Sequence, residues 1–232
     1  MSVPDHPFKA GFAAMAPLAA AAAVFGMIFG AEALRHGLTP AEVVLMSATV
    51  FAGGSQFMAV GLWSDPVPWL GITIAVLLIN LRHVLMSASL IRKMDAFRPW
   101  QRALAAFFLA DETWAVSERR ALAQPLTPAF YAGAALTLYL AWIAGTAAGT
   151  VLGGLVNSPE RFGLDFAFPA AFICMVMGFA KSWRAAPVIA ASAAAALLTR
   201  QWLGGTWFVI IGGLVGMAVA AMLPVAGSEG DR

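Results

Sequence analysis

Long apolar stretches without any charged residue constrain this chain more than any other feature. Residues 43–64, 121–159 and 201–228 contain no Asp, Glu, Lys or Arg. A helix needs about 20 predominantly apolar residues to cross the hydrocarbon core of a bilayer, so each stretch is long enough for one crossing. The apolar runs are continuous and do not alternate every second residue, which favours helices over a membrane β-barrel. The sequence therefore predicts an all-α polytopic membrane protein.

Composition excludes the soluble alternatives. Hydrophobic residues make up 61% of the chain and charged residues 11%, whereas an average soluble domain has about 25% charged residues. The apolar content excludes disorder, and a disulfide scaffold would need more than Cys174, the single cysteine. In a membrane chain the net charge of +2 describes only the short loops. We therefore expect lipid around the chain and no nucleic-acid partner.

Seven apolar segments are expected to cross the membrane, together with one short element. Residues 103–117 span only about 15 positions and contain Asp111 and Glu112, which favours a short or re-entrant element over a full crossing or an interfacial helix. The polar stretch 92–102 is too short to link separate domains, so residues 1–232 are expected to form a single transmembrane domain. The seven segments are 10–31, 43–63, 67–91, 129–156, 166–180, 185–199 and 203–225.

The positions of Lys and Arg predict the orientation. Short cytoplasmic loops are enriched in these residues. With seven crossings and an outside N-terminus, ten of the 14 basic residues face the cytoplasm, and this predicts a periplasmic N-terminus and a cytoplasmic C-terminus. The ten residues are Arg35, Arg92, Lys93, Arg98, Arg102, Arg119, Arg120, Lys181, Arg184 and Arg232.

The first group of polar residues at membrane depth is Gly53, Gly54, Ser55 and Gln56. Such residues are costly in a bilayer and mark a cavity, a partner or a substrate path. The glycine pair permits either close helix approach or local unwinding. Gln56 adds a hydrogen-bond donor and an acceptor at the same point. Tight packing, with Gln56 bonded to a neighbouring backbone, is the alternative interpretation.

The second group is Asn80, Arg82 and His83, within segment 67–91. Arg82 lies about 15 Å along a helix from Arg92, close to the middle of a hydrocarbon core of roughly 30 Å. An arginine at that depth needs an acid, a cavity lined by carbonyl groups or an anionic substrate group. A permanent internal ion pair and direct contact with substrate remain equal alternatives.

Asp111 and Glu112 form the third group. Adjacent residues on a helix point about 100° apart, so one acid can pair with Arg82 while the other faces elsewhere and titrates. An exposed interfacial loop is the alternative. We expect one structural acid and one titratable acid.

No motif of soluble enzymes or cofactor sites is present. The chain has no phosphate-binding loop, no dinucleotide fingerprint and no zinc spacing among its three histidines. We therefore expect no enzyme activity, no cofactor and no metal. One enzyme alternative is an intramembrane serine protease with a dyad of Ser55 and His83, although the charge of Arg82 would disfavour the imidazolium that such a dyad forms.

Small residues recur at four-residue spacing in three of the apolar segments. This spacing allows close helix approach and indicates internal packing, with a subunit interface as the alternative. The pairs are Gly26 and Gly30, Gly145 and Gly149, Gly149 and Gly153, and Gly212 and Gly216.

Three motifs in this order resemble one known family. They are Phe51-Ala-Gly-Gly-Ser-Gln-Phe57, Ile79-Asn-Leu-Arg-His83, and Asp111-Glu112 after a basic loop. The chain resembles the AzlC family, also known as BrnF, the large subunit of branched-chain amino acid exporters. The resemblance extends from about residue 11 to residue 223, although beyond residue 128 it consists mainly of hydropathy and spacing.

The resemblance implies export of hydrophobic amino acids (leucine, isoleucine, valine and methionine) across the bacterial inner membrane, coupled to the proton gradient. It also implies a small AzlD-type membrane subunit as partner. A zwitterion with an apolar side chain needs a donor set, an acceptor and an apolar pocket. We expect substrate contacts from Gly53, Gly54, Ser55, Gln56, Asn80 and Arg82, and an ion pair or proton coupling from His83, Asp111 and Glu112. A passive channel for small solutes and a membrane scaffold are the alternatives.

Overall fold

The computed structural model describes residues 6–155, 185–203 and 207–223, and every regular element in them is a helix. The chain divides into two compact units. The first comprises Met1–Gly61 and Ile79–Phe168, and the second comprises Leu62–Leu78 and Pro169–Arg232. The predicted segment 166–180, Cys174, and the predicted loop residues Lys181, Arg184 and Arg232 lie outside the described residues. We describe each unit by itself.

Within the described residues, three helices are long and apolar enough to cross a membrane. They are α1 (Pro7–Arg35), α4 (Trp69–Ile91) and α7 (Pro128–Leu155, with the apolar part ending at Gly153). They coincide with three of the seven predicted segments. This finding confirms the all-α polytopic class.

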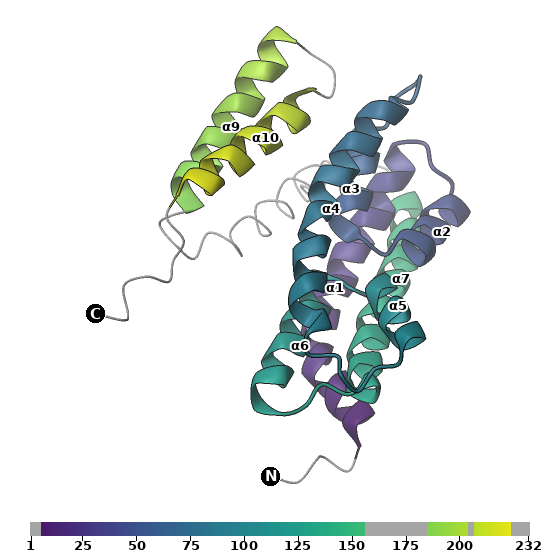
Figure 1. The fold of residues 1–232 in the computed structure, drawn as a ribbon. Coiled ribbons are helices and arrows are strands. Elements are labelled where there is room, and N and C mark those ends of the chain that lie inside the picture. The colour runs from purple at the N-terminus through teal and green to yellow at the C-terminus, as the bar shows by residue number, and fades with distance from the viewer. Residues whose placement is uncertain (1–5, 156–184, 204–206, 224–232) are drawn as a thin grey trace. The chain divides into compact units, whose positions relative to one another are not determined.

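Glycines hold α1 and α7 together in the first unit. A Cβ atom added to Gly11 would overlap the carbonyl oxygen of Phe130, and one added to Gly30 would overlap that of Thr146. Because the residue numbers rise together along both helices, α1 and α7 run parallel, and Figure 1 shows them side by side. Gly145, on α7, has the same relation to the backbone of Ala23. The predicted internal packing of these glycines is confirmed.

The predicted crossing 43–63 consists of two short helices, α2 (Pro40–Val50) and α3 (Gly53–Gly61). Phe51 separates them with left-handed backbone angles, φ 44° and ψ 46°. α2 runs antiparallel to α7. The Ser47 hydroxyl lies 3.0 Å from that of Thr146, whereas Phe51, later in the chain, packs its ring on Tyr139, which comes earlier on α7.

α3 then turns back towards the end from which α2 came. The Gln56 side chain reaches back to Ser47 on α2, and the Phe57 ring packs on Phe29 near the end of α1. The two helices, residues 40–61, therefore form a re-entrant hairpin and not a crossing. We call it the first hairpin. It enters at the end of the unit where α1 finishes, which we call the distal end.

A second re-entrant hairpin, residues 99–123, enters from the opposite, proximal end, where α1 and α7 begin. It consists of α5 (Pro99–Phe107) and α6 (Asp111–Ala123). Arg82, on α4, pairs with Asp111, while Lys93, two residues after the end of α4, pairs with Glu118. α6 therefore runs parallel to α4, and α5, which precedes it, runs in the opposite direction. This arrangement agrees with the expected re-entrant element at 103–117.

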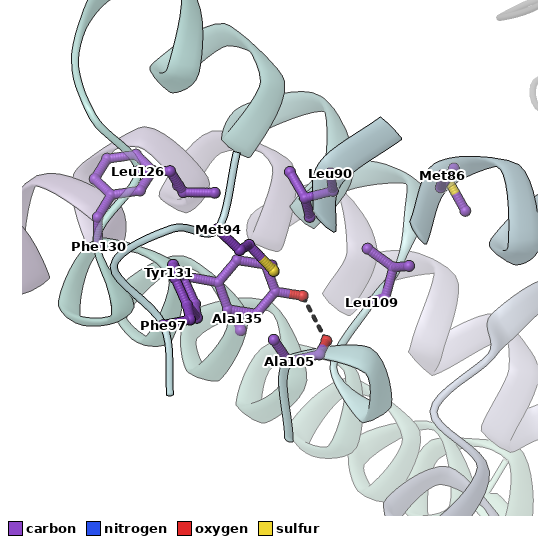
Figure 2. Close-up of a cluster of buried hydrophobic side chains, with 10 residues drawn as sticks. All are labelled: Met86, Leu90, Met94, Phe97, Ala105, Leu109, Leu126, Phe130, Tyr131 and Ala135. Atoms are coloured by element: carbon purple, nitrogen blue, oxygen red, sulfur yellow. Dashed lines mark hydrogen bonds between the residues drawn. The ribbon is translucent and has the colours of Figure 1, made fainter. Parts of the chain in front are cut away.

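A hydrophobic cluster anchors the second hairpin at the proximal end (Figure 2). Tyr131 donates a hydrogen bond of 2.7 Å to the carbonyl oxygen of Ala105, which fixes α5 against the first turns of α7. The cluster consists of Met86, Leu90, Met94, Phe97, Ala105, Leu109, Leu126, Phe130, Tyr131 and Ala135.

The second unit contains α9 (Ala185–Trp202), α10 (Trp207–Met222) and the first half of α4. The Ser192 hydroxyl on α9 donates 2.8 Å to the carbonyl oxygen of Gly212 on α10. A Cβ on Gly216 would lie 3.2 Å from the Ser192 side chain, which confirms internal packing for this glycine pair as well. These helices correspond to the predicted segments 185–199 and 203–225.

The first hairpin changes the topology expected from the sequence. A crossing at 43–63 would place the N-terminus and the loop 92–102 on opposite sides of the membrane. With a re-entrant hairpin in its place, Lys9 and Arg92 lie at the same, proximal end. This arrangement differs from the sequence-based expectation, which placed the N-terminus and the loop 92–102 on opposite sides of the membrane. The physical reason is that about 20 apolar residues suffice either for one crossing or for a hairpin that enters half of the membrane.

Candidate functional site at the tips of two hairpins

The tips of the two hairpins meet near the middle of the first unit. The ring of Phe51, at the first tip, lies 6.2 Å from the ring of Phe108, at the second tip, in an edge-on arrangement. Tyr139, on α7, contacts both, with ring centroids 5.0 Å from Phe51 and 5.2 Å from Phe108. Two helix interruptions that approach from opposite ends are thus joined by aromatic contacts.

A buried polar network holds the first hairpin. Gln56 is fully buried, and its Nε2 donates 3.0 Å to Ser47. The Trp142 indole donates 3.2 Å to Gln56 Oε1, and the Ser47 and Thr146 hydroxyls lie 3.0 Å apart. Both ends of the Gln56 amide therefore have partners, and the network ties α2, α3 and α7 together.

Gly53 packs under the same tryptophan. A Cβ on Gly53 would come within 2.8 Å of the Trp142 ring. The sequence left open whether the glycine pair allows close helix approach or a local break in the helix. Both occur, because α3 begins at Gly53 directly after the interruption and Gly53 also packs closely against Trp142. Gly54 is buried beside it.

Ser55 connects the first hairpin to α4. Its hydroxyl donates 2.9 Å to Asn80 Oδ1. His83, which the serine protease alternative would pair with Ser55, has a buried Nδ1 with no hydrogen-bond partner among the described residues. The geometry of the dyad is absent from the part of the chain that the structure describes.

Arg82 and Asp111 connect α4 to the second hairpin. Arg82 Nη1 lies 2.7 Å from Asp111 Oδ2, and 27% of the arginine side chain and 33% of the aspartate side chain remain exposed within the chain. The buried Nε of Arg82 has no hydrogen-bond partner among the described residues. The ion pair predicted for one of the two acids is confirmed, and the guanidinium retains donor capacity for a further anionic group.

Glu112 follows Asp111 in the first turn of α6. No hydrogen bond or ion pair to another side chain is found for it in the described part of the chain, and the residue is half-buried. The division into one structural and one titratable acid stays a prediction.

The predicted site residues therefore fall into two adjacent groups, one at each tip. The first group, Gly53, Gly54, Ser55 and Gln56, lies at the start of α3, with Asn80 of α4 beside Ser55. The second group consists of Asp111 and Glu112 at the start of α6, with Arg82 of α4 paired to Asp111. Sequence reasoning missed four residues that complete the site: Ser47, Tyr139, Trp142 and Thr146. The signal that could have found Ser47 and Thr146 is a hydroxyl inside an apolar segment.

Comparisons with known proteins point to one family. The family model described as AzlC protein matches residues 17–156, which contain both hairpins. The chain belongs to the AzlC family. An uncharacterized membrane protein of Archaeoglobus fulgidus is 30% identical over 172 residues, which cover 73% of this chain and 74% of that protein.

Two further relatives of this AzlC-family chain have more informative names. The inner membrane protein YgaZ of Escherichia coli is 30% identical over 156 residues, 64% of this chain and 63% of that protein. The branched-chain amino acid transport protein AzlC of Bacillus subtilis is 24% identical over 177 residues, 76% of this chain and 68% of that protein. No solved structure matches the chain.

Proposed function

We propose that this chain is a secondary transporter that exports hydrophobic amino acids, the branched-chain ones and methionine, across a bacterial inner membrane in exchange with protons. The observation that carries the proposal is the meeting of two re-entrant tips beside Ser55, Asn80, Arg82 and Asp111. Interrupted helices at membrane depth occur where they are buried in protein or line a water-filled cavity, and transporters place substrate sites at such interruptions. The name of the Bacillus subtilis relative supports the substrate class.

The polar groups suit a zwitterion. The free donor capacity of Arg82 is suited to the substrate carboxylate, with Asn80 and Ser55 as neutral hydrogen-bonding partners. Asp111, already paired with Arg82, is released when a substrate carboxylate takes its place. Glu112 and His83 are then the groups that carry the coupled proton. Gln56 contributes by holding the tip, because both ends of its amide have partners.

A cytoplasmic N-terminus is part of the proposal. Among the described residues of the first unit, the proximal end carries seven Lys and Arg residues, whereas the distal end carries Arg35. The positive-inside rule therefore assigns the proximal end to the cytoplasm. The seven are Lys9, Arg92, Lys93, Arg98, Arg102, Arg119 and Arg120.

The test is efflux of preloaded leucine, isoleucine, valine and methionine from cells that express the chain with and without a small AzlD-type subunit. We expect efflux that a protonophore abolishes. Efflux that follows the substrate gradient and ignores the protonophore would identify a passive channel. No efflux of any of the four from correctly inserted protein, with the small subunit present, would contradict the proposal.

Arg82→Ala and Asp111→Asn should each remove efflux. A matched control is available nearby, because Lys93, just after the end of α4, forms a second ion pair with Glu118 on α6. Lys93→Met should leave efflux close to that of the unmodified chain. Equal losses in both pairs would indicate that the ion pairs act only in assembly of the fold.

A further inference from the structure

Three aromatic side chains meet where the two hairpin tips come together. Phe51, Phe108 and Tyr139 contact one another pairwise, with ring centroids between 5.0 and 6.2 Å apart. Edge-on ring pairs at these distances are close-packed. The three residues come from three different elements, namely the first tip, the second tip and α7.

Polar groups follow each ring closely in the sequence. Ser55, bonded to Asn80, comes one helical turn after Phe51, and Asp111, paired with Arg82, comes three residues after Phe108. A molecule held by these polar groups through its amino and carboxylate ends would therefore direct its side chain towards the rings.

Phe51 has an unusual backbone. Its φ of 44° is the single positive value at a non-glycine residue in the described part of the chain. For a bulky side chain this conformation is strained, and such strain persists where the surrounding structure imposes it, most often at functional sites. Phe51 is only 5% exposed at the tip. A glycine at this position would adopt the same backbone angles without strain, but it would not supply the ring.

Tyr139 has a second contact that fixes its ring. Its hydroxyl donates 2.8 Å to the carbonyl oxygen of Ala48, near the end of α2. That carbonyl belongs to the last turn of α2, where the helix leaves its acceptors unsatisfied. The ring of Tyr139 is thereby held between the tips.

From these contacts, and resting on the transport function proposed above, we propose that Phe51, Phe108 and Tyr139 form the side-chain selectivity filter of the transporter. A substrate side chain enters by taking the place of a ring between the tips. The filter admits branched aliphatic side chains because one ring moves aside for a group smaller than itself. An aromatic substrate is rejected because the remaining rings leave too little room for it.

The test measures transport of leucine and phenylalanine in proteoliposomes that contain the full chain with its small subunit. Phe108→Ala removes one ring from the filter and should raise the ratio of phenylalanine to leucine in kcat/KM by about tenfold or more, the range expected when a pocket gains or loses a few carbon atoms. Phe51→Leu is the milder second variant and should shift the ratio in the same direction by a smaller factor.

Phe97→Leu is the matched control. Phe97 is 5% exposed, as Phe51 is, and packs edge-on against Tyr131 with ring centroids 6.1 Å apart. It belongs to the proximal hydrophobic cluster and not to the tips. The substitution should lower the amount of folded protein without changing the ratio.

The outcomes separate this inference from the proposed function. If the unmodified chain transports leucine and the ratio in both filter variants equals that in Phe97→Leu, the filter is wrong while the transport function stands. If the unmodified chain transports neither amino acid, both the proposed function and the proposed filter are contradicted. If the phenylalanine-to-leucine ratio also changes in Phe97→Leu, the change in selectivity comes from a general loosening of the fold. That result would contradict the proposed filter.

Discussion

The guanidinium of Arg82 on α4 lies 2.7 Å from the carboxylate of Asp111, the first residue of α6. This contact joins the middle of a long membrane helix to the tip of a re-entrant hairpin that enters from the proximal end. It places a charge pair at a depth where an unpaired charge is costly, with about a third of each side chain exposed within the chain.

Exchanging the two charges tests whether the pair is structural or also functional. Arg82→Ala alone leaves the carboxylate of Asp111 without its partner and should lower both the amount of folded protein and transport. In the exchanged variant Arg82→Asp with Asp111→Arg, we expect folded protein to recover while transport stays about tenfold or more below normal, because the guanidinium then projects from α6 and no longer from α4. Thermal unfolding in detergent and efflux are the measurements. Recovery of both would show that only the pairing matters.

Removing the Gln56 amide should destabilise the first hairpin. Gln56→Leu leaves the buried Ser47 hydroxyl and Trp142 indole without these partners, at a cost of about 1–3 kcal/mol. Thr49→Ala, on the same hairpin, is the control, since that exposed hydroxyl bonds only within its own helix. Thermal unfolding should separate the two variants, and equal midpoints would contradict the role of the network.

A methyl group between α1 and α7 should be poorly tolerated. Gly149→Ala places a Cβ atom against the backbone of Met27, and forcing the helices apart should cost about 1–3 kcal/mol or more. Gly213→Ala is the matched helical glycine, because its added Cβ would meet its nearest neighbour, Leu78, at an ordinary 3.8 Å. That variant should be neutral or slightly stabilising. A neutral Gly149→Ala would contradict the close contact.

Acidic pH should weaken the attachment of α6 to α4 at the proximal end. Burial alone would raise the pKa of Glu118, but hydrogen bonds from Lys93 and Ser89, together with the Lys93 charge, hold that pKa below its ordinary value of 4.5. A depressed pKa contributes stability that is present above the unfolded value and lost as the pH falls through the folded one. Glu118→Gln should therefore show a smaller fall in unfolding temperature below pH 4.5. An unchanged pH profile would contradict this.

Side-specific labelling tests the topology. In a Cys174→Ser background, Lys9→Cys and Arg92→Cys should react from the same side of the membrane, because both residues are exposed at the proximal end. Thr39→Cys, at the exposed start of the first hairpin, should react from the other side. Reaction of Lys9→Cys and Arg92→Cys from opposite sides would restore a crossing at residues 43–63.

The sequence predicts those features that avoid a large free-energy penalty, either for an unpaired charge in the membrane or for a backbone overlap. Arg82 near mid-membrane requires an acid, and Asp111 supplies it. Glycines at four-residue spacing require a closely approaching backbone, and α1 and α7 provide it for each other. Both expectations depend on local chemistry and membrane depth, which can be read from a single chain.

The sequence does not reveal the reversal at Phe51. A hairpin and a crossing of the same length bury similar apolar residues, and the difference lies in tertiary partners such as Trp142 and Tyr139. Those two residues look like ordinary aromatic members of an apolar helix until α2 and α3 pack against them. When a hairpin takes the place of the crossing at 43–63, every residue before it changes its side of the membrane relative to the loop 92–102.

The contact between α1 and α7 has one further consequence. Glycines bring the two backbones into direct contact at several levels, from Gly11 against Phe130 to Gly153 against Ala31, so neither helix can slide along the other without backbone overlap. Under the proposed transport function, α1 and α7 are therefore expected to move as one rigid pair, with access to the centre changed by motion of the hairpins against them. Since the hairpins enter from opposite ends, each is suited to open one side of the membrane while the other remains closed.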